Sequence, residues 1–256
     1  MKDGSLIPRF GRARRDPALA VLEGFHPVKH ALRFGASLQL LVTSDPDELQ
    51  RLAASLAPDL APGLAQAQVL ERAVFEQLSP LAPTTPVMAI AERPLVQPGE
   101  VLASPHDAPV ILLEDPRDLG NMGACVRVAA AADAAGVLTT GTHDPWHPDA
   151  LRGAAGLHFA LPVARLASLE ELEQGPRPLL ALDPDGAPLH AGSLPPRSVL
   201  AFGTERHGLS DELSARARQL IRIPMREGVS SLNLATSVAA VLFAWRATTE
   251  EGSEGG

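Results

Sequence analysis

The sequence predicts an α/β fold in two parts, a small N-terminal α/β domain and a second domain built on a parallel sheet. From residue 105 onwards, short apolar runs alternate with helical patterns. Strands without polar residues are typical of a parallel sheet that helices cover on both faces. Seven prolines interrupt residues 80–109, so this stretch cannot be regular throughout. The 256 residues also exceed the roughly 150 typical of one domain, and we place a domain boundary near residue 104.

The first part is expected to begin with a flexible basic arm at residues 1–16. Residues 17–104 then form the N-terminal domain and its proline-rich linker, with a regular apolar pattern from about residue 18. The expected elements, in order, are a helix at 28–32, a strand at 38–42, helical segments at 49–56 and 64–78, and a strand at 88–91.

The second part covers residues 105–249, and the remaining residues 250–256 are expected to be a disordered tail. Its alanine-rich helix at 123–135 is predicted to end at Gly136 as a C-cap. The other expected elements are strands at 110–114, 137–140, 159–163, 179–182 and 199–202, short helices at 149–155 and 168–173, and a last helix at 231–247.

Composition excludes several classes of protein. Hydrophobic residues make up 45% of the chain, and no apolar run approaches the roughly 18 residues that cross a bilayer. The basic start of the chain has no apolar block after it, so no secretory signal is visible. Cys125 is the single cysteine and cannot form an internal disulfide or a cysteine-based zinc site, so we expect a reducing cytoplasm. The histidine pairs at 26/30 and 143/147 have no further ligand nearby in the sequence, so we expect no metal.

The charge is distributed unevenly along the chain. The net charge of −8 argues against non-specific coating of nucleic acid. From Met1 to Gly35, however, seven basic residues stand against three acidic ones. This asymmetry indicates an anionic partner for the N-terminal end. A solubilising disordered arm is the alternative interpretation.

Three unusual loops are assigned to carboxyl ends of strands, at residues 115–127, 202–210 and 223–233. In an open parallel sheet, ligands bind at the carboxyl ends of the strands, so these loops are the expected site. The chain has no GxGxxG motif, and Leu209 stands where a P-loop would have its lysine. These absences count against an unrelated doubly wound nucleotide enzyme.

Each loop carries an ordered set of polar and glycine residues. The first has an asparagine, five residues and an arginine leading into a helix and a glycine. The second ends an apolar strand with Gly-x-Glu-x-x-Gly, and the third joins Ile-Pro-Met to Ser-Leu-Asn at the last helix. These positions are Asn121, Arg127, Gly136, Gly203, Glu205, Gly208, Ile223, Pro224, Met225, Ser231, Leu232 and Asn233. In order and spacing, over about residues 110–248, they resemble the SpoU/TrmH family of RNA ribose 2′-O-methyltransferases, in the SPOUT class.

The resemblance implies methyl transfer from S-adenosylmethionine to a ribose 2′-hydroxyl of structured RNA, rRNA rather than tRNA. It points to Arg127 as the catalytic group, whose guanidinium offers a planar fork to a phosphate and a positive field beside the hydroxyl. Since the pKa of arginine exceeds about 12, we favour electrostatic activation over proton abstraction. The alternative for Arg127 is an exposed helix arginine in an ion pair.

Four further side chains are expected to act beside this arginine. Asn121 and Asn233 would fix the loops or hold the ribose, and Ser231 would contact the target phosphate or ribose. Glu205 would orient Asn121 or Arg127. The alternatives are helix capping for the two asparagines and the serine, and a loop ion pair for the glutamate.

The resemblance also implies a cofactor site. The adenosine of S-adenosylmethionine would be held by backbone near Gly203, Ile223 and Leu232, together with Gly208 and Met225. Amide groups would bind the adenine edge while apolar side chains pack on its face. For Ile223 and Leu232, the alternative is a place in the ordinary core.

Other expectations come from the resemblance alone. Residues 23–32 look like part of the small RNA-binding domain that precedes the catalytic domain in many members. A homodimer with the cofactor near its interface and a C-terminal trefoil knot are also implied. The last helix is apolar on more than one face, which fits an interface. The alternative function is a non-catalytic RNA-binding protein that keeps the fold.

Overall fold

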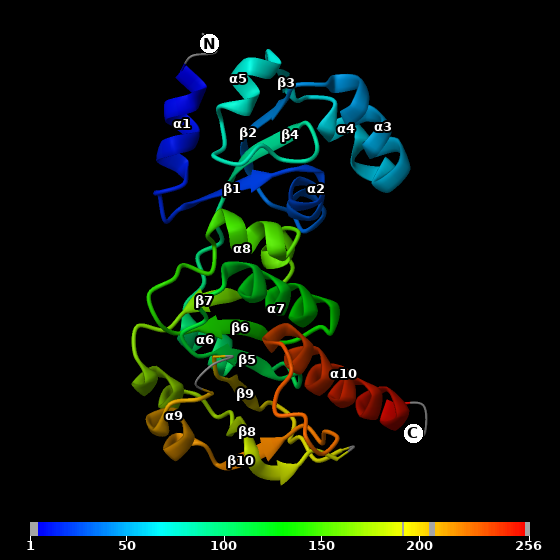
Figure 1. Ribbon diagram of the computed structural model, residues 1–256. Helices are drawn as coiled ribbons and strands as arrows, with labels where there is room; N and C mark the ends of the chain where they lie inside the picture. Colours follow the sequence, from blue (N-terminus) through cyan, green and yellow to red (C-terminus); the bar gives the residue numbers. More distant parts are fainter. Residues whose placement is uncertain (1–4, 191, 205–207, 254–256) are drawn as a thin grey trace. The chain divides into compact units, whose positions relative to one another are not determined.

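The computed structural model describes residues 5–190, 192–204 and 208–253, and the chain divides into two compact units. Unit 1 comprises residues 1–95 and 146–160, and unit 2 comprises residues 96–145 and 161–256 (Figure 1). The expected boundary near residue 104 is therefore displaced. Val101 and Leu102 of helix α6 (Pro98–Ala103) are buried in the core of unit 2, which assigns this helix to that unit.

Unit 1 is a four-stranded sheet covered by helices. The strand order is β1-β4-β2-β3, in which β4 is antiparallel to both neighbours and β3 is parallel to β2. The strands are β1 (Leu19–Glu23), β2 (Leu38–Thr43), β3 (Gln68–Val69) and β4 (Val87–Glu92). The helices are α1 (Leu6–Ala13), α2 (Phe25–Arg33), α3 (Pro46–Leu56), α4 (Ala61–Leu64), α5 (Arg72–Glu76) and α8 (Pro148–Gly153), with short 3₁₀ helices at Pro58–Leu60 and Leu157–Phe159.

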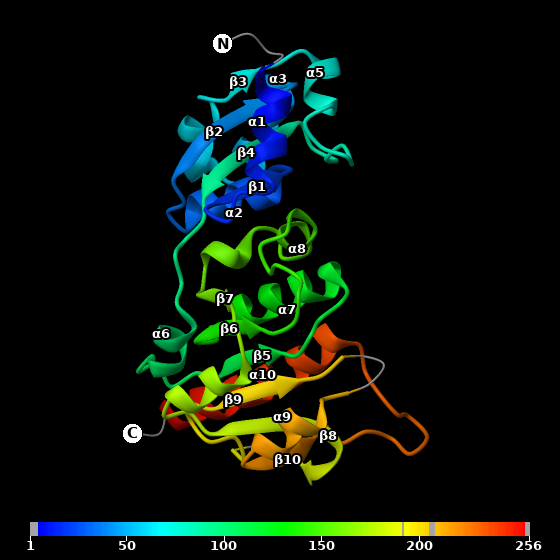
Figure 2. The same cartoon turned by 90° about the vertical axis from the view of Figure 1, so that its left-hand side faces the viewer.

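The expectation of a flexible arm is wrong for residues 6–13, which form α1. Leu6, Phe10 and Ala13 recur at helical spacing and are buried in the core of unit 1, where α1 lies across one face of the sheet (Figure 2). The helical segment expected at 64–78 is also wrong, because Gln68 and Val69 pair with β2 and separate α4 from α5.

Glu23 is a buried carboxylate at the end of β1, with 5% of its surface exposed. Arg14 donates to it at 2.7 Å, Arg152 at 2.5 Å and Ser79 at 2.8 Å. Burial alone would raise the pKa of Glu23, but hydrogen bonds from Arg14, Arg152 and Ser79 outweigh it and leave the pKa below its usual value. The arginine of α8 is thereby tied to the first strand of the chain.

We expect Glu23→Gln to lower the free energy of unfolding by roughly 2 kcal/mol at neutral pH, because two charge-assisted hydrogen bonds are lost. A carboxyl whose folded pKa is depressed stabilises the fold above its unfolded pKa, and this contribution is lost as the pH falls through the folded pKa. The difference in unfolding free energy between the wild type and the variant should therefore become smaller at acid pH. Urea unfolding at neutral and acid pH measures it.

Asp59→Asn is the matched control for this measurement. It breaks an exposed pair in the same unit, in which the side chains of Arg33 and Asp59 are 39% and 56% exposed. Such exposed pairs contribute little to stability, so the control should leave the unfolding free energy close to that of the wild type. Equal stability of Glu23→Gln and wild type at neutral pH would contradict the role of the buried carboxylate.

Unit 2 confirms the predicted parallel sheet. Its six strands run in the order β10-β8-β9-β5-β6-β7, and every neighbouring pair is parallel. The strands are β5 (Val110–Leu113), β6 (Gly136–Thr139), β7 (Val163–Arg165), β8 (Leu179–Pro188), β9 (Val199–Phe202) and β10 (Gln219–Arg222). The helices are α6, α7 (Leu119–Ala131), α9 (Asp211–Arg216) and α10 (Leu234–Ser253), with a 3₁₀ helix at Leu169–Gln174.

Several local expectations for unit 2 are corrected. Gly136 is not a C-cap but opens β6, where a Cβ would lie 2.6 Å from Val101 Cγ1. α7 already ends at Ala131, and Asp133 takes the left-handed conformation after it, with φ of 57°. α10 runs to Ser253, so the disordered tail expected at 250–256 is wrong for residues 250–253. Within the described residues, no helix has the length and apolar character to cross a bilayer.

Candidate active site

The first and second loops are joined where β5 and β9 end. Leu113 and Phe202 are partners in register, and the Glu114 amide donates to the Phe202 carbonyl at 2.9 Å. The Glu114 carboxylate accepts hydrogen bonds from the Ser210 amide at 2.7 Å and from its hydroxyl at 2.5 Å. Sequence reasoning missed this contact. The available signal was a carboxylate directly after an apolar strand.

The first and third loops are joined by two asparagines. Asn233 Nδ2 donates to Asn121 Oδ1 at 3.1 Å, while Asn233 Oδ1 accepts from the amides of Ala235 at 3.0 Å and Thr236 at 3.4 Å. Asn233 therefore caps α10 and also contacts α7. Capping is wrong for Asn121, because Asp118 is the N-cap of α7 and accepts from the Asn121 amide. The predicted pair is thus brought together by adjacent helices.

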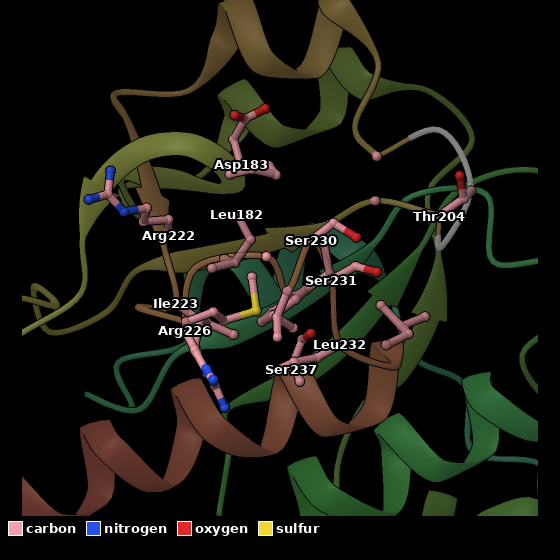
Figure 3. A pocket seen from close by; sticks show the side chains of 18 of the residues that line it. Leu182, Asp183, Thr204, Arg222, Ile223, Arg226, Ser230, Ser231, Leu232 and Ser237 are labelled. Atoms are coloured by element: carbon pink, nitrogen blue, oxygen red, sulfur yellow. The ribbon is translucent and has the colours of Figure 1, made fainter.

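A cavity of about 590 Å³ lies beside the middle of β8 and at the ends of β9 and β10 (Figure 3). This volume is within the range of small-molecule sites. Its wall includes all five residues predicted for the cofactor and one predicted catalytic residue, namely Gly203, Gly208, Ile223, Met225, Leu232 and Ser231. It also includes residues that sequence reasoning missed, among them Leu182, Asp183, Thr204, Arg222, Arg226 and Ser237.

The second loop closes tightly at its two glycines. Thr204 and Gly208 exchange backbone hydrogen bonds, each of 3.0 Å. A Cβ on Gly203 would lie 2.0 Å from the Gly208 carbonyl carbon and 2.3 Å from the Leu209 nitrogen. Gly208 itself has φ of 65°, a conformation that favours glycine. Gly203 is therefore required for the close approach of backbone at the cavity wall, whereas Gly208 is favoured by its left-handed conformation.

Apolar side chains of the third loop form another part of the wall. Met225 and Leu232 are each 37% exposed, and Ile223 is half-buried, so these residues are not ordinary core. In Figure 3, the hydroxyls of Ser230 and Ser231 point to the side of the cavity on which Thr204 lies. An apolar wall with a few polar groups fits a molecule that has a flat aromatic ring and polar ends, as S-adenosylmethionine has.

Arg127 is exposed on α7 and does not line this cavity. Within the described part of the chain it forms no hydrogen bond or ion pair, so the ion-pair alternative is not realised there. Asn121 and Asn233 also lie outside the cavity wall. Glu205 falls outside the described residues. Among residues that are described, no group of three or more histidine, cysteine or acidic side chains is arranged to hold a metal ion.

The fold and site define an α/β protein with a ligand-sized cavity at the carboxyl edge of a parallel sheet. Residues 108–243 match the sequence profile of the SpoU rRNA Methylase family. The chain belongs to this family. The resemblance seen in the three loops is thereby confirmed.

Two relatives of known name differ in their sequence identity to this chain and in the share of their length that aligns with it. The Syntrophobacter fumaroxidans protein named ribosomal RNA small subunit methyltransferase G 2 is 32% identical over 73% of this chain, which spans only 37% of that protein's length. The Bacillus subtilis protein named 23S rRNA (guanosine(2553)-2′-O)-methyltransferase RlmP is 26% identical, over 87% of this chain and 86% of its own length.

A solved structure extends the similarity to the whole fold. The S-adenosylmethionine-bound rRNA methyltransferase from Sinorhizobium meliloti superposes with a TM-score of 0.74 and 25% identity. The alignment covers 96% of this chain and 94% of that one. Both units of the present chain thus have counterparts in one solved protein.

Proposed function

We propose that this chain transfers the methyl group of S-adenosylmethionine to a ribose 2′-hydroxyl of structured RNA. The sulfonium supplies the methyl group to the ribose oxygen, the hydroxyl proton passes to solvent and S-adenosylhomocysteine remains. The observation that carries this proposal is the cavity of about 590 Å³ walled by the motif glycines and apolar residues. The Sinorhizobium meliloti relative, crystallised with S-adenosylmethionine, supports the identity of the donor.

The side chains outside the cavity serve the RNA side of the reaction in this proposal. Arg127 would contact the target phosphate and stabilise the developing ribose oxyanion by its charge. Asn121 and Asn233 would hold the first and third loops at a fixed separation through their 3.1 Å hydrogen bond. Ser231, which lines the cavity, would contact the ribose or its phosphate. Most of the rate gain then comes from positioning and electrostatics.

We propose rRNA rather than tRNA as the substrate and the cytoplasm as the place of reaction. The support is the Bacillus subtilis relative, which is named as a 23S rRNA methyltransferase and aligns over most of both chains. Unit 1 would bind the RNA and select the target. The solved relative that aligns over both units is itself described as an rRNA methyltransferase, which supports rRNA as the substrate.

The active form is proposed to be a homodimer that pairs through α10. An apolar groove of about 410 Å³ follows this helix and is lined by Ala240, Ala244 and Ile223, among others. Ile223 also lines the cofactor cavity, so the groove and the cavity are adjacent. Phe243 on the same helix is 47% exposed, and a second copy would cover it.

The proposed activity is tested by mapping 2′-O-methyl groups in cellular RNA with and without the gene for this chain. We expect one ribose methylation of rRNA to disappear. Calorimetry with S-adenosylmethionine separates this function from a non-catalytic RNA-binding protein, which would give no binding heat. An unchanged methylation map together with no binding heat would overturn the proposal.

The contact between the first two loops yields a further prediction. Glu114→Ala removes both hydrogen bonds to Ser210, so the loop that carries Gly203 loses its support. We expect the Kd for S-adenosylmethionine to rise about tenfold, measured by calorimetry. Arg117→Ala is the control, because its side chain is 79% exposed in the same loop. Equal affinities of Glu114→Ala and wild type would show that the contact does not shape the site.

A further inference from the structure

Helix α1 presents arginines on the side that faces away from the core of unit 1. On the opposite side of the helix, its residues Phe10 and Ala13 are buried in the core. Arg14, which follows the helix, donates to the buried Glu23 at 2.7 Å. These contacts fix the helix on the sheet. Arg12 and Arg15 are exposed, and they are held in place rather than carried on a flexible arm.

These cations have no acidic partner in the described part of the chain. Arg12 and Arg15 form no side-chain hydrogen bond or ion pair there, and Arg9 donates only to the Gln39 carbonyl at 3.2 Å. The nearby Asp16 carboxylate accepts from the Ala18 amide instead. Arg9 and Arg12 on the helix, together with Arg15 in the turn that follows it, provide a positive surface that is suited to an anionic partner.

The charge balance of the two units favours the same interpretation. Unit 1 contains equal numbers of basic and acidic residues, so the whole net charge of −8 falls on unit 2. Unit 2 therefore repels a polyanion on average, and the attraction must come from local positive surfaces. The α1 surface, defined as Arg9, Arg12 and Arg15, combines three arginines within seven residues.

We propose that the α1 surface binds the phosphate backbone of the RNA substrate. The proposal rests on the proposed function only for the choice of RNA as the polyanion. Arg9 and Arg12 lie roughly 4.5 Å apart along the helix axis, and Arg15 follows in the turn after the helix, so their forked donors can reach neighbouring phosphates. Such contacts are independent of base sequence and fix the position of the RNA without selecting the target nucleotide.

The test compares two double variants of the full chain that remove the same charge. Arg12→Gln/Arg15→Gln removes cations of the α1 surface, while Arg51→Gln/Arg72→Gln removes exposed cations on α3 and α5. Glutamine keeps helix propensity close to that of arginine. Anisotropy of a fluorescein-labelled RNA hairpin, titrated over a series of KCl concentrations, gives the affinity and its salt dependence. Calorimetry with S-adenosylmethionine is run on each protein.

We expect the α1 variant to bind the hairpin about tenfold more weakly and to lower the slope of log K against log salt by about 2. The control should match the wild type, and all three proteins should bind S-adenosylmethionine equally. An α1 variant with wild-type affinity and slope would overturn the proposal and leave methyl transfer untouched, as expected if α1 met an acidic protein instead. Failure of the wild type to bind the hairpin would also overturn it, while the methylation map decides the proposed function separately.

Discussion

Arg127→Ala should reduce methyl transfer by about 10²- to 10³-fold, the range for loss of one group that stabilises a developing oxyanion. Binding of S-adenosylmethionine should stay at the wild-type level, because Arg127 does not line the cofactor cavity. The fold should also be preserved, since the side chain is exposed and forms no hydrogen bond or ion pair with the described residues. Transfer of labelled methyl groups to rRNA measures the activity, and calorimetry measures the binding of S-adenosylmethionine.

Two further variants identify what the guanidinium contributes. Arg127→Lys keeps the charge but loses the planar fork, so we expect it to recover only part of the activity. Arg117→Ala removes another exposed arginine of unit 2 and should leave transfer unchanged. If the positive charge alone were sufficient, the lysine variant would be nearly fully active. Turnover of Arg127→Ala close to that of wild type would remove Arg127 from the mechanism.

The parallel sheet could be predicted because its central strands contain no polar residue. Val110–Leu113 and Val199–Phe202 are buried along their whole length, so sequence and environment agree. The edge strand β10 was missed, since within Gln219–Arg222 only Ile221 is buried. Helical and strand patterns are thus readable where burial is complete, and they fade at the edge of the sheet.

Contacts between distant segments set the limit of the sequence analysis. Residues 146–160 belong to unit 1 through contacts such as Arg152 with Glu23 and Arg93 over the Trp146 ring, which no local pattern reveals. The bond between Glu114 and Ser210 likewise depends on the register of β5 and β9. In α1, by contrast, the signal was present. The buried Leu6, Phe10 and Ala13 follow helical spacing, but the surrounding arginines favoured the interpretation of a flexible arm.

The candidate cofactor wall was predicted more completely than the catalytic set. The motif positions that line the cavity lie in loops whose strands end at one edge of a parallel sheet, and this convergence follows from topology. Arg127 and Asn121 lie on α7 and Asn233 caps α10, so their orientation depends on how these two helices pack. Spacing identifies these residues but does not determine which surface they face.

Gly203→Ala should abolish measurable binding of S-adenosylmethionine, raising its Kd by more than about 100-fold, the equivalent of roughly 2.7 kcal/mol. The added methyl group would lie 2.0 Å from the Gly208 carbonyl carbon, and backbone on both sides of the loop must move to accept it.

Two other glycine variants serve as comparisons. Gly208→Ala has open space for its Cβ but a φ of 65°, so we expect a smaller loss of affinity, about tenfold. Gly63→Ala in unit 1 meets nothing within 4 Å and should bind as the wild type does. Calorimetry on the three variants ranks their Kd values for S-adenosylmethionine, and circular dichroism checks that each variant is folded. Wild-type affinity in a folded Gly203→Ala protein would mean that the donor binds elsewhere than in this cavity.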